Sequence, residues 1–271
     1  MESLDEIVRH NWVRLKLSHD NGILVVRLAR PEARNALDPV MMAELTLCAQ
    51  RISRSAMLRA VILCGNDDFF SAGVDLKASR QRALSDLALL EQRTQAAAGP
   101  DLCKAWEEIE AITIAAVEGF CIGGACALAL ACDFRILAER AYLRLPEVPL
   151  GMNMSWHALP RLHALIGASR AKQFVLFGEP LTAEQCLSWG LADQICPKGD
   201  ALQMARQWAA RVRALPPVPV RMTKEAINGL SKSASSGFMD RDQFLLCARS
   251  NDYSEGTRAF LEKRTPQFRG E

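Results

Sequence analysis

Short runs of β-branched residues alternate with helical patterns along the first part of the chain. Residues 13–18 and 22–29 form two such runs, and the Asn21-Gly22 pair that joins them predicts a β-hairpin. Asp38-Pro39 then predicts the start of a helix, because aspartate caps a first helical turn and proline fits its first position. Apolar residues keep helical spacing from there to about residue 55.

The pattern continues with buried strands separated by helices. Strands are predicted at residues 60–64, 112–119, 134–139 and 141–145, and helices at residues 102–112 and 123–131, with polar and partly helical sequence at residues 75–99. The repeated order of strand, strand and helix predicts α/β units that stack on one another.

Helical patterns dominate after Ser155. Predicted helices cover residues 156–165, 170–177, 183–189, 201–215, 218–229 and 240–262. The serine-rich segment 231–237 is typical of a flexible link before the last helix. We therefore expect an α/β core over residues 1–200 and a helical region over residues 201–271. The helical region carries more apolar residues than one small domain needs, which favours self-assembly.

One apolar stretch, residues 111–132, has the length of a membrane span. Glu118-Gly119 and Gly123-Gly124 divide it, with β-branched residues before the glycines and Ala and Leu after them. We therefore expect a buried strand, a tight turn and a buried helix there, and no membrane span. The N-terminal ten residues are acidic and polar, which predicts neither a signal peptide nor a transit peptide.

The composition of the 271 residues, 49% hydrophobic and 24% charged, is that of a globular protein. The 33 basic and 31 acidic residues leave a formal net charge of +2, so no basic surface for nucleic acid is expected. Nine cysteines without a CxxC pair predict reduced, buried thiols and a cytoplasmic location rather than structural zinc or disulfides. The four histidines lack metal-ligand spacing, so no metal site is expected.

Two glycine-containing stretches have the form needed to present backbone N–H groups to a ligand. In FSAGVDL, residues 70–76, Gly73 allows close backbone approach and Asp75 can cap a following helix. In GFCIGGACA, residues 119–127, a glycine pair precedes a helix N-terminus, which stabilises an anion or a developing oxyanion. Taken singly, the first stretch is more typical of an ordinary capped loop, and the glycine pair of the second is also typical of close helix packing.

Glu147 lies among apolar residues and two prolines in LPEVPLG, residues 145–151. Such surroundings raise the pKa of a carboxyl group, which suits general acid and base catalysis. A glutamate beside proline is also common in ordinary loops. The three stretches are more informative together than singly, because their order and spacing agree with a known pattern.

In this combination the sequence resembles the crotonase (enoyl-CoA hydratase/isomerase) superfamily over nearly its whole length. RPEARNAL at residues 30–37 and FLEKRTPQF at residues 260–268 resemble the early and C-terminal segments of that family. The resemblance implies an α/β fold with a crotonase-like ββα spiral core and a C-terminal helical oligomerisation region. It also implies an acyl-CoA substrate, no permanently bound cofactor, and a homotrimer or a hexamer built from two trimers.

The resemblance also assigns roles to individual residues. The backbone N–H groups of Val74 and Gly124 match the oxyanion hole that holds the thioester carbonyl, and Glu147 matches an acid/base residue. Coenzyme A is expected along Arg34, Ala72, Asp75 and Leu76 with Lys263 near its phosphates, and the acyl pocket is expected at Ser155 and Trp156. Arg30 is a further candidate for the phosphate side.

Two departures from the family pattern bear on the reaction. Ala127 stands where the hydratase pattern has its first glutamate, so Glu147 alone remains. Hydration uses two positioned acid/base groups, whereas one carboxylate suffices to move a proton from C2 to C4 of a 3-enoyl-CoA. Trp156 replaces a small residue, which narrows the expected site and excludes water. These departures favour an isomerase of fatty acid metabolism that converts 3-enoyl-CoA to 2-enoyl-CoA.

Three alternatives remain open. The first is a hydratase acting on 2-enoyl-CoA, with Glu147 and a second group that the motifs do not identify. The second is an acyl-CoA decarboxylase or thioester hydrolase, since an oxyanion hole stabilises any enolate or tetrahedral intermediate. The third is a CoA-binding protein without activity, because loss of one glutamate is also what such a protein would show.

Overall fold

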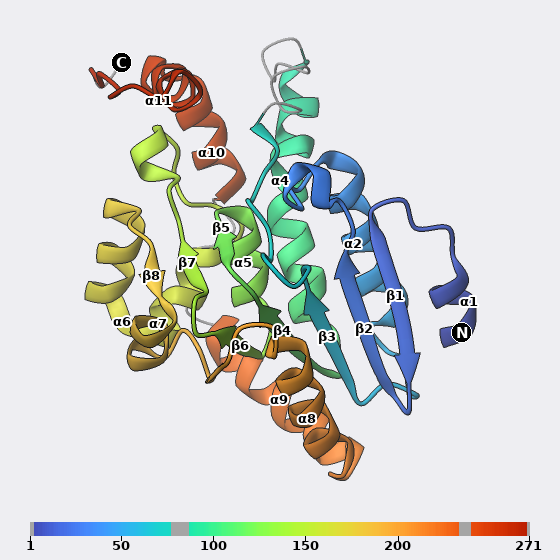
Figure 1. Ribbon diagram of the computed structural model, residues 1–271. Coiled ribbons are helices and arrows are strands. Elements are labelled where there is room, and N and C mark those ends of the chain that lie inside the picture. Colours follow the sequence, from blue (N-terminus) through green and yellow to red (C-terminus); the bar gives the residue numbers. More distant parts are fainter. Residues whose placement is uncertain (1–2, 77–86, 233–239, 270–271) are drawn as a thin grey trace.

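A six-stranded sheet forms the centre of the fold, with the strand order β1-β2-β3-β4-β6-β9 (Figure 1). The computed structural model describes residues 3–76, 87–232 and 240–269. The strands are β1 (Leu15–Asp20), β2 (Ile23–Leu28), β3 (Ala60–Cys64), β4 (Ile112–Val117), β6 (Phe134–Ala138) and β9 (Gln194–Cys196). β1 and β2 pair antiparallel around Asn21-Gly22, which confirms the predicted hairpin, and the other neighbours pair parallel.

A smaller sheet consists of β5 (Phe120–Ile122), β7 (Tyr142–Arg144) and β8 (Leu181–Thr182), in the order β5-β7-β8. β5 follows β4 after a turn at Glu118-Gly119, where Gly119 has a φ of 52°. A side chain on Gly119 would collide with the carbonyl of Asp68, so the turn requires glycine. The strand predicted over residues 112–119 therefore ends at Val117, and the chain passes from one sheet into the other.

Helices pack on both faces of the large sheet. The helices of the described residues are α1 (Leu4–Arg9), η1 (Pro31–Ala33), α2 (Pro39–Ile52), α4 (Leu89–Glu107), α5 (Gly124–Leu130), η3 (Val148–Leu150), α6 (Ala158–Phe177), α7 (Ala183–Trp189), α8 (Ala201–Arg213), α9 (Pro217–Lys232), α10 (Asp240–Ala248) and α11 (Asn251–Glu262). The predicted start of α2 is confirmed, because the Asp38 carboxylate accepts a hydrogen bond of 2.8 Å from the Met41 N–H.

Two of the helix predictions, for residues 102–112 and 240–262, are wrong in extent. The helix predicted over residues 102–112 is α4, which begins at Leu89, continues through Gly99-Pro100 and ends before β4. The helices predicted over residues 156–165 and 170–177 are confirmed as the two helical segments of α6, which are separated at Gly167 by a non-helical φ of 73° and ψ of 169°. The helix predicted over residues 240–262 is divided into α10 and α11, because the Ser250 hydroxyl accepts a hydrogen bond from the Tyr253 N–H and starts a new helix.

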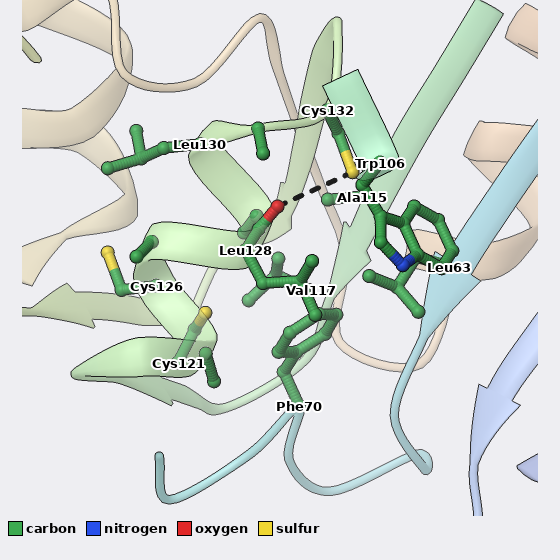
Figure 2. Close-up of a cluster of buried hydrophobic side chains, with 14 of the residues drawn as sticks. Leu63, Phe70, Trp106, Ala115, Val117, Cys121, Cys126, Leu128, Leu130 and Cys132 are labelled. Carbon is green, nitrogen blue, oxygen red and sulfur yellow. Dashed lines mark hydrogen bonds between the residues drawn. The ribbon is translucent and has the colours of Figure 1, made fainter. Parts of the chain in front are cut away.

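The main core lies between the large sheet and the helices α2, α4 and α5. α5 is fully buried, and Figure 2 shows Cys126 within it and Cys121 and Cys132 before and after it, all as buried side chains of the core. Trp106 of α4 is completely buried, and its indole N–H donates a hydrogen bond to the Leu45 carbonyl of α2. This packing fixes α5, and with it the glycine turn at its N-terminus.

The opposite face of the sheet is covered by α8. Its alanines at 201, 205 and 209 pack against isoleucines of β3, β4 and β6. The division expected at residue 200 thus falls directly before a helix that packs on the core sheet, and it stays a prediction. In the described part of the chain, no helix combines the length and hydropathy needed to cross a membrane.

Candidate active site

The glycine turn joins β5 to α5. Gly123 has a φ of 56°, a conformation that favours glycine, and Gly124 is the first residue of the helix. The N–H groups of a first helical turn have no partner within the helix, so the Gly124 N–H is available to a ligand. The sequence prediction of a strand, a glycine turn and a buried helix is confirmed at this place.

The FSAGVDL loop lies directly against this turn. The Ile122 N–H donates a hydrogen bond of 3.1 Å to the Ser71 carbonyl, and Ser71 forms an isolated bridge with Cys121. A Cβ atom on Gly73 would lie 2.5 Å from the Ile122 carbonyl oxygen and 3.6 Å from the Gly123 Cα atom. Only glycine therefore permits this approach, which brings the two predicted oxyanion segments into contact.

Val74 and Gly124 each follow one of the two glycines in contact. Within the described part of the chain, neither of their N–H groups donates a hydrogen bond. Val74 and Leu37 form an isolated bridge. Its two hydrogen bonds run from the Leu37 N–H to the Gly73 carbonyl and from the Asp75 N–H to the Leu37 carbonyl, so the Val74 N–H is not used. The corner thus presents two free backbone donors from two different segments, which is the arrangement that an oxyanion hole needs.

Glu147 reaches this corner from the other side. It follows β7 at the start of η3, and its Oε1 atom lies 2.9 Å from the position that a Cβ atom on Gly123 would take. Its Oε2 atom is buried and has no hydrogen-bond partner among the described residues. Burial raises the pKa of Glu147 to about 7, against the opposing effects of its own backbone N–H and of Arg144. At neutral pH this carboxyl group exists in both protonation states.

Trp156 closes the site. A Cβ atom on Gly124 would lie 2.7 Å from its Cη2 and Cζ2 atoms, and one on Gly99 would lie 2.6 Å from its Cδ2 and Nε1 atoms. The indole therefore fits between two glycines, one in α4 and one at the start of α5. Trp156 and the next residue, His157, both have positive φ, at 66° and 52°. Two consecutive non-glycine residues in this region mark a backbone held by its surroundings. Ser155, which precedes them, is buried.

The residues expected along coenzyme A lie partly in the FSAGVDL loop and partly outside it. Ala72 donates its N–H to the Arg34 carbonyl at 3.0 Å, and Asp75 and Leu76 continue the same loop. The Asp75 carboxylate forms an ion pair of 2.7 Å with Arg30, so Arg30 is engaged in the protein itself. Lys263 belongs to a later part of the chain and is exposed at the C-terminal end of α11. Arg34 is exposed as well.

Two features of this region were not predicted from the sequence. The side-chain oxygen and nitrogen of Asn153 are both buried and have no hydrogen-bond partner among the described residues. η3, which directly follows Glu147, packs against α11, a helix that lies more than one hundred residues later in the chain. Asn153 gives a weak signal in the sequence, as a polar residue between two methionines, whereas no local pattern indicates the contact with α11.

Comparison with known proteins identifies the family. The sequence matches the family model described as enoyl-CoA hydratase/isomerase over residues 18–271. The chain belongs to the enoyl-CoA hydratase/isomerase family. The resemblance found in the motifs is thereby confirmed, and this family member is an enzyme of acyl-CoA thioesters, a substrate class that the family uses without a permanent cofactor.

Relatives of this enoyl-CoA hydratase/isomerase family member cover nearly the whole chain. The 2,3-dehydroadipyl-CoA hydratase of Escherichia coli is 33% identical over 261 residues, 94% of this chain and 98% of that protein. The crotonyl-CoA hydratase of Syntrophomonas wolfei is 31% identical over 255 residues, 93% of this chain and 96% of that protein.

Solved structures agree with the family assignment. An enoyl-CoA hydratase/isomerase from Pseudoalteromonas atlantica superposes with a TM-score of 0.84 at 27% identity, covering 94% of this chain and 100% of its own. A carnitinyl-CoA hydratase from Mycobacterium avium superposes with a TM-score of 0.83 at 29% identity, covering 95% of this chain and 99% of its own. The predicted crotonase-like α/β fold with a C-terminal helical region is confirmed.

Proposed function

We propose that the protein moves a double bond in an acyl-CoA thioester, converting 3-enoyl-CoA to 2-enoyl-CoA with Glu147 as the single proton shuttle. The observation that carries this proposal is the buried carboxyl group of Glu147, whose pKa is about 7. A group with a pKa near the working pH can both accept and donate a proton readily. Ala127 is completely buried in α5 and supplies no second acid/base group.

The proposed isomerisation moves one proton, which is removed from C2 of the acyl chain and returned to C4. The Glu147 carboxylate removes a proton from C2, and the electron pair moves into a dienolate whose negative charge rests on the thioester oxygen. The N–H groups of Val74 and Gly124 stabilise that charge. Glu147 then returns the proton to C4, which leaves the double bond between C2 and C3. No atom is gained or lost, so no second reactant is required.

Trp156 supports the same proposal. Its indole fills the space beside Gly124, where a Cβ atom would lie 2.7 Å from the ring. A site closed in this way excludes the water that hydration would consume, and it keeps the dienolate from side reactions. Ser155 and Trp156 together shape the acyl pocket, and Arg34, Ala72, Asp75, Leu76 and Lys263 line the path of coenzyme A.

A second candidate is hydration of 2-enoyl-CoA. The named curated relatives are hydratases, and the buried Asn153 amide offers a group that both donates and accepts hydrogen bonds. It follows Met152, whose N–H is bonded to the Glu147 carbonyl at 2.9 Å. A water held by Glu147 and Asn153 would then take the place of the pair of carboxylates.

One set of assays separates the two candidates. The wild type, Glu147→Gln and Asn153→Leu are compared on 3-enoyl-CoA and 2-enoyl-CoA thioesters of equal chain length. The isomerase proposal expects 3-enoyl-CoA turnover that falls about 10²- to 10⁴-fold in Glu147→Gln and changes little in Asn153→Leu. Hydration of 2-enoyl-CoA that is faster than isomerisation and is lost in Asn153→Leu would establish the second candidate instead.

The proposed assembly is a homotrimer or a hexamer. Large apolar side chains are exposed on α6 and α9 of the single chain: Leu176, Phe177, Met222, Ile227 and Leu230. Water-exposed apolar surface of this kind favours burial against another copy. Sedimentation velocity at micromolar concentration tests this assembly, and a monomer there would contradict it.

A further inference from the structure

The C-terminal helix α11 contacts η3 through backbone atoms. A Cβ atom on Gly256 of α11 would collide with the carbonyl group of Leu150, its distance to the carbonyl carbon being 2.5 Å. The reverse also holds, because a Cβ atom on Gly151 would lie 2.5 Å from the Asp252 carbonyl oxygen. Two glycines thus allow a helix and a turn to approach more closely than side chains permit.

We propose that Gly256 is a positioning residue, which lets α11 dock on η3 and thereby holds Glu147 against Gly123 and shields its carboxylate from water. This inference rests on the proposed role of Glu147. The path from one to the other is short: the Glu147 carbonyl accepts hydrogen bonds of 3.0 Å from the Leu150 N–H and 2.9 Å from the Met152 N–H. A displacement of Leu150 therefore moves the backbone of Glu147.

α11 is held firmly enough to act as a support. Its N-terminus is capped by Ser250, and the Thr257 hydroxyl donates a hydrogen bond of 2.7 Å to the Tyr253 carbonyl. Glu255, the neighbour of Gly256, binds Arg264 and the Gln267 N–H of the C-terminal segment. α10, which precedes α11, packs along α4. In Figure 1, α11 lies at the top of the molecule above the turn between β7 and α6.

The charged and titratable groups around Glu147 show how a displaced α11 would act. Arg144 favours the ionised carboxylate, and the buried Cys126 thiol lies close enough to interact with it. From α11, the Asp252 carboxylate accepts a hydrogen bond of 2.7 Å from the Arg269 N–H. Arg144 and Cys126 do not belong to α11, so moving the helix leaves them in place. A displaced α11 would then act on Glu147 by letting water reach its carboxyl group, which stabilises the ionised carboxylate and lowers its pKa.

The test compares Gly256→Ala with Gly229→Ala. Gly229 is a glycine of the helix α9, and a Cβ atom there would meet nothing within 4 Å. The pKa of Glu147 is measured by titration of ¹³C-labelled glutamate carboxyl groups, with the resonance assigned by its loss in Glu147→Gln. Because this readout does not require turnover, it remains valid if the enzyme proves not to be an isomerase.

We expect Gly256→Ala to lower the pKa of Glu147 by about one unit. We also expect kcat to fall about tenfold or more, because small displacements of a catalytic group are costly. Gly229→Ala should change neither quantity. A folded Gly256→Ala protein with an unchanged Glu147 pKa would overturn the inference. If Gly256→Ala does not fold, Ser250→Ala weakens α11 at its cap instead, and an unchanged pKa there would overturn it equally.

Discussion

The indole of Trp156 occupies the space that a side chain on Gly124 would need, with its Cζ2 atom 2.7 Å from the position of a Cβ atom. The Gly124 N–H is one of the two proposed oxyanion donors, so the Trp156 indole lies directly beside the place where the thioester carbonyl is expected. On the proposed function, the size of this side chain would decide which acyl groups can bring their thioester carbonyl to the donors.

Trp156→Ala should widen the acyl pocket. We expect kcat/KM for 3-enoyl-CoA thioesters to rise for long or branched acyl chains relative to short ones, because the indole no longer fills the space beside Gly124. Steady-state kinetics over a series of chain lengths measures this shift. Trp189→Ala, in α7, serves as the control, since it removes another half-buried tryptophan and should leave the chain-length preference unchanged.

The rate should depend on the ionisation of Glu147. As a base, the carboxylate must be unprotonated, so kcat/KM is expected to rise with pH through about 7, the pKa of this group. A pH–rate profile on 3-enoyl-CoA measures the position of this limb. A rate that is flat between pH 5 and pH 8 would remove Glu147 from the role of general base.

Glu147→Gln should stabilise the protein at pH 8 although it lowers turnover strongly. The folded pKa of about 7 exceeds the usual value of 4.5, so the folded state binds more protons than the unfolded state between these values. Stability therefore falls as pH rises through this window, by about 3 kcal/mol in total. Glutamine does not ionise, so the variant does not lose this stability. In urea unfolding, the free energy of unfolding of the variant should exceed that of the wild type at pH 8 and differ little from it at pH 4.5. The exposed Glu184→Gln should show no such pH-dependent gain.

Gly73→Ala should damage the oxyanion hole. Its Cβ atom would lie 2.5 Å from the Ile122 carbonyl oxygen and would separate Val74 from the glycine turn. Loss of one oxyanion donor reduces kcat by about 10²- to 10³-fold, which sets the expected effect.

Gly199→Ala is the matched control for Gly73→Ala. Both glycines have a positive φ, at 90° and 85°, but a Cβ atom on Gly199 would meet nothing within 4 Å. Both variants should therefore lose similar backbone stability, whereas only Gly73→Ala should lose kcat. Equal losses of kcat in the two variants would show that backbone strain, rather than displacement of Val74, is responsible.

Local signals predicted much of the fold and of the site. The Asn21-Gly22 turn and the Asp38 cap each depend on a few neighbouring residues, and both form as expected. Gly73 and Gly123 lie in two motifs that together produce the family resemblance. The sequence therefore contained the parts of the proposed oxyanion hole, although the contact between them is seen only in the structure.

The features that the sequence did not predict depend on distant contacts. α4 continues through Gly99-Pro100 because tertiary packing against Trp156 and the core compensates for the bond that proline cannot make. The docking of Gly256 on Leu150 joins residues that share no local pattern. Hydrophobic periodicity predicts which face of a segment is buried, but it does not predict which distant segment packs against that face. Neither contact could therefore be predicted from it.

The burial of the cysteines has a consequence for how the protein behaves outside its reaction. Eight of the nine free thiols are buried, and burial raises the pKa of Cys48, Cys132 and Cys186 to about 12. Thiolates are the reactive form, so the folded protein should react slowly with alkylating reagents except at the half-buried Cys247. A buried thiol can be labelled only after the structure around it has opened. The labelling rate of each native cysteine therefore measures how often its region unfolds locally.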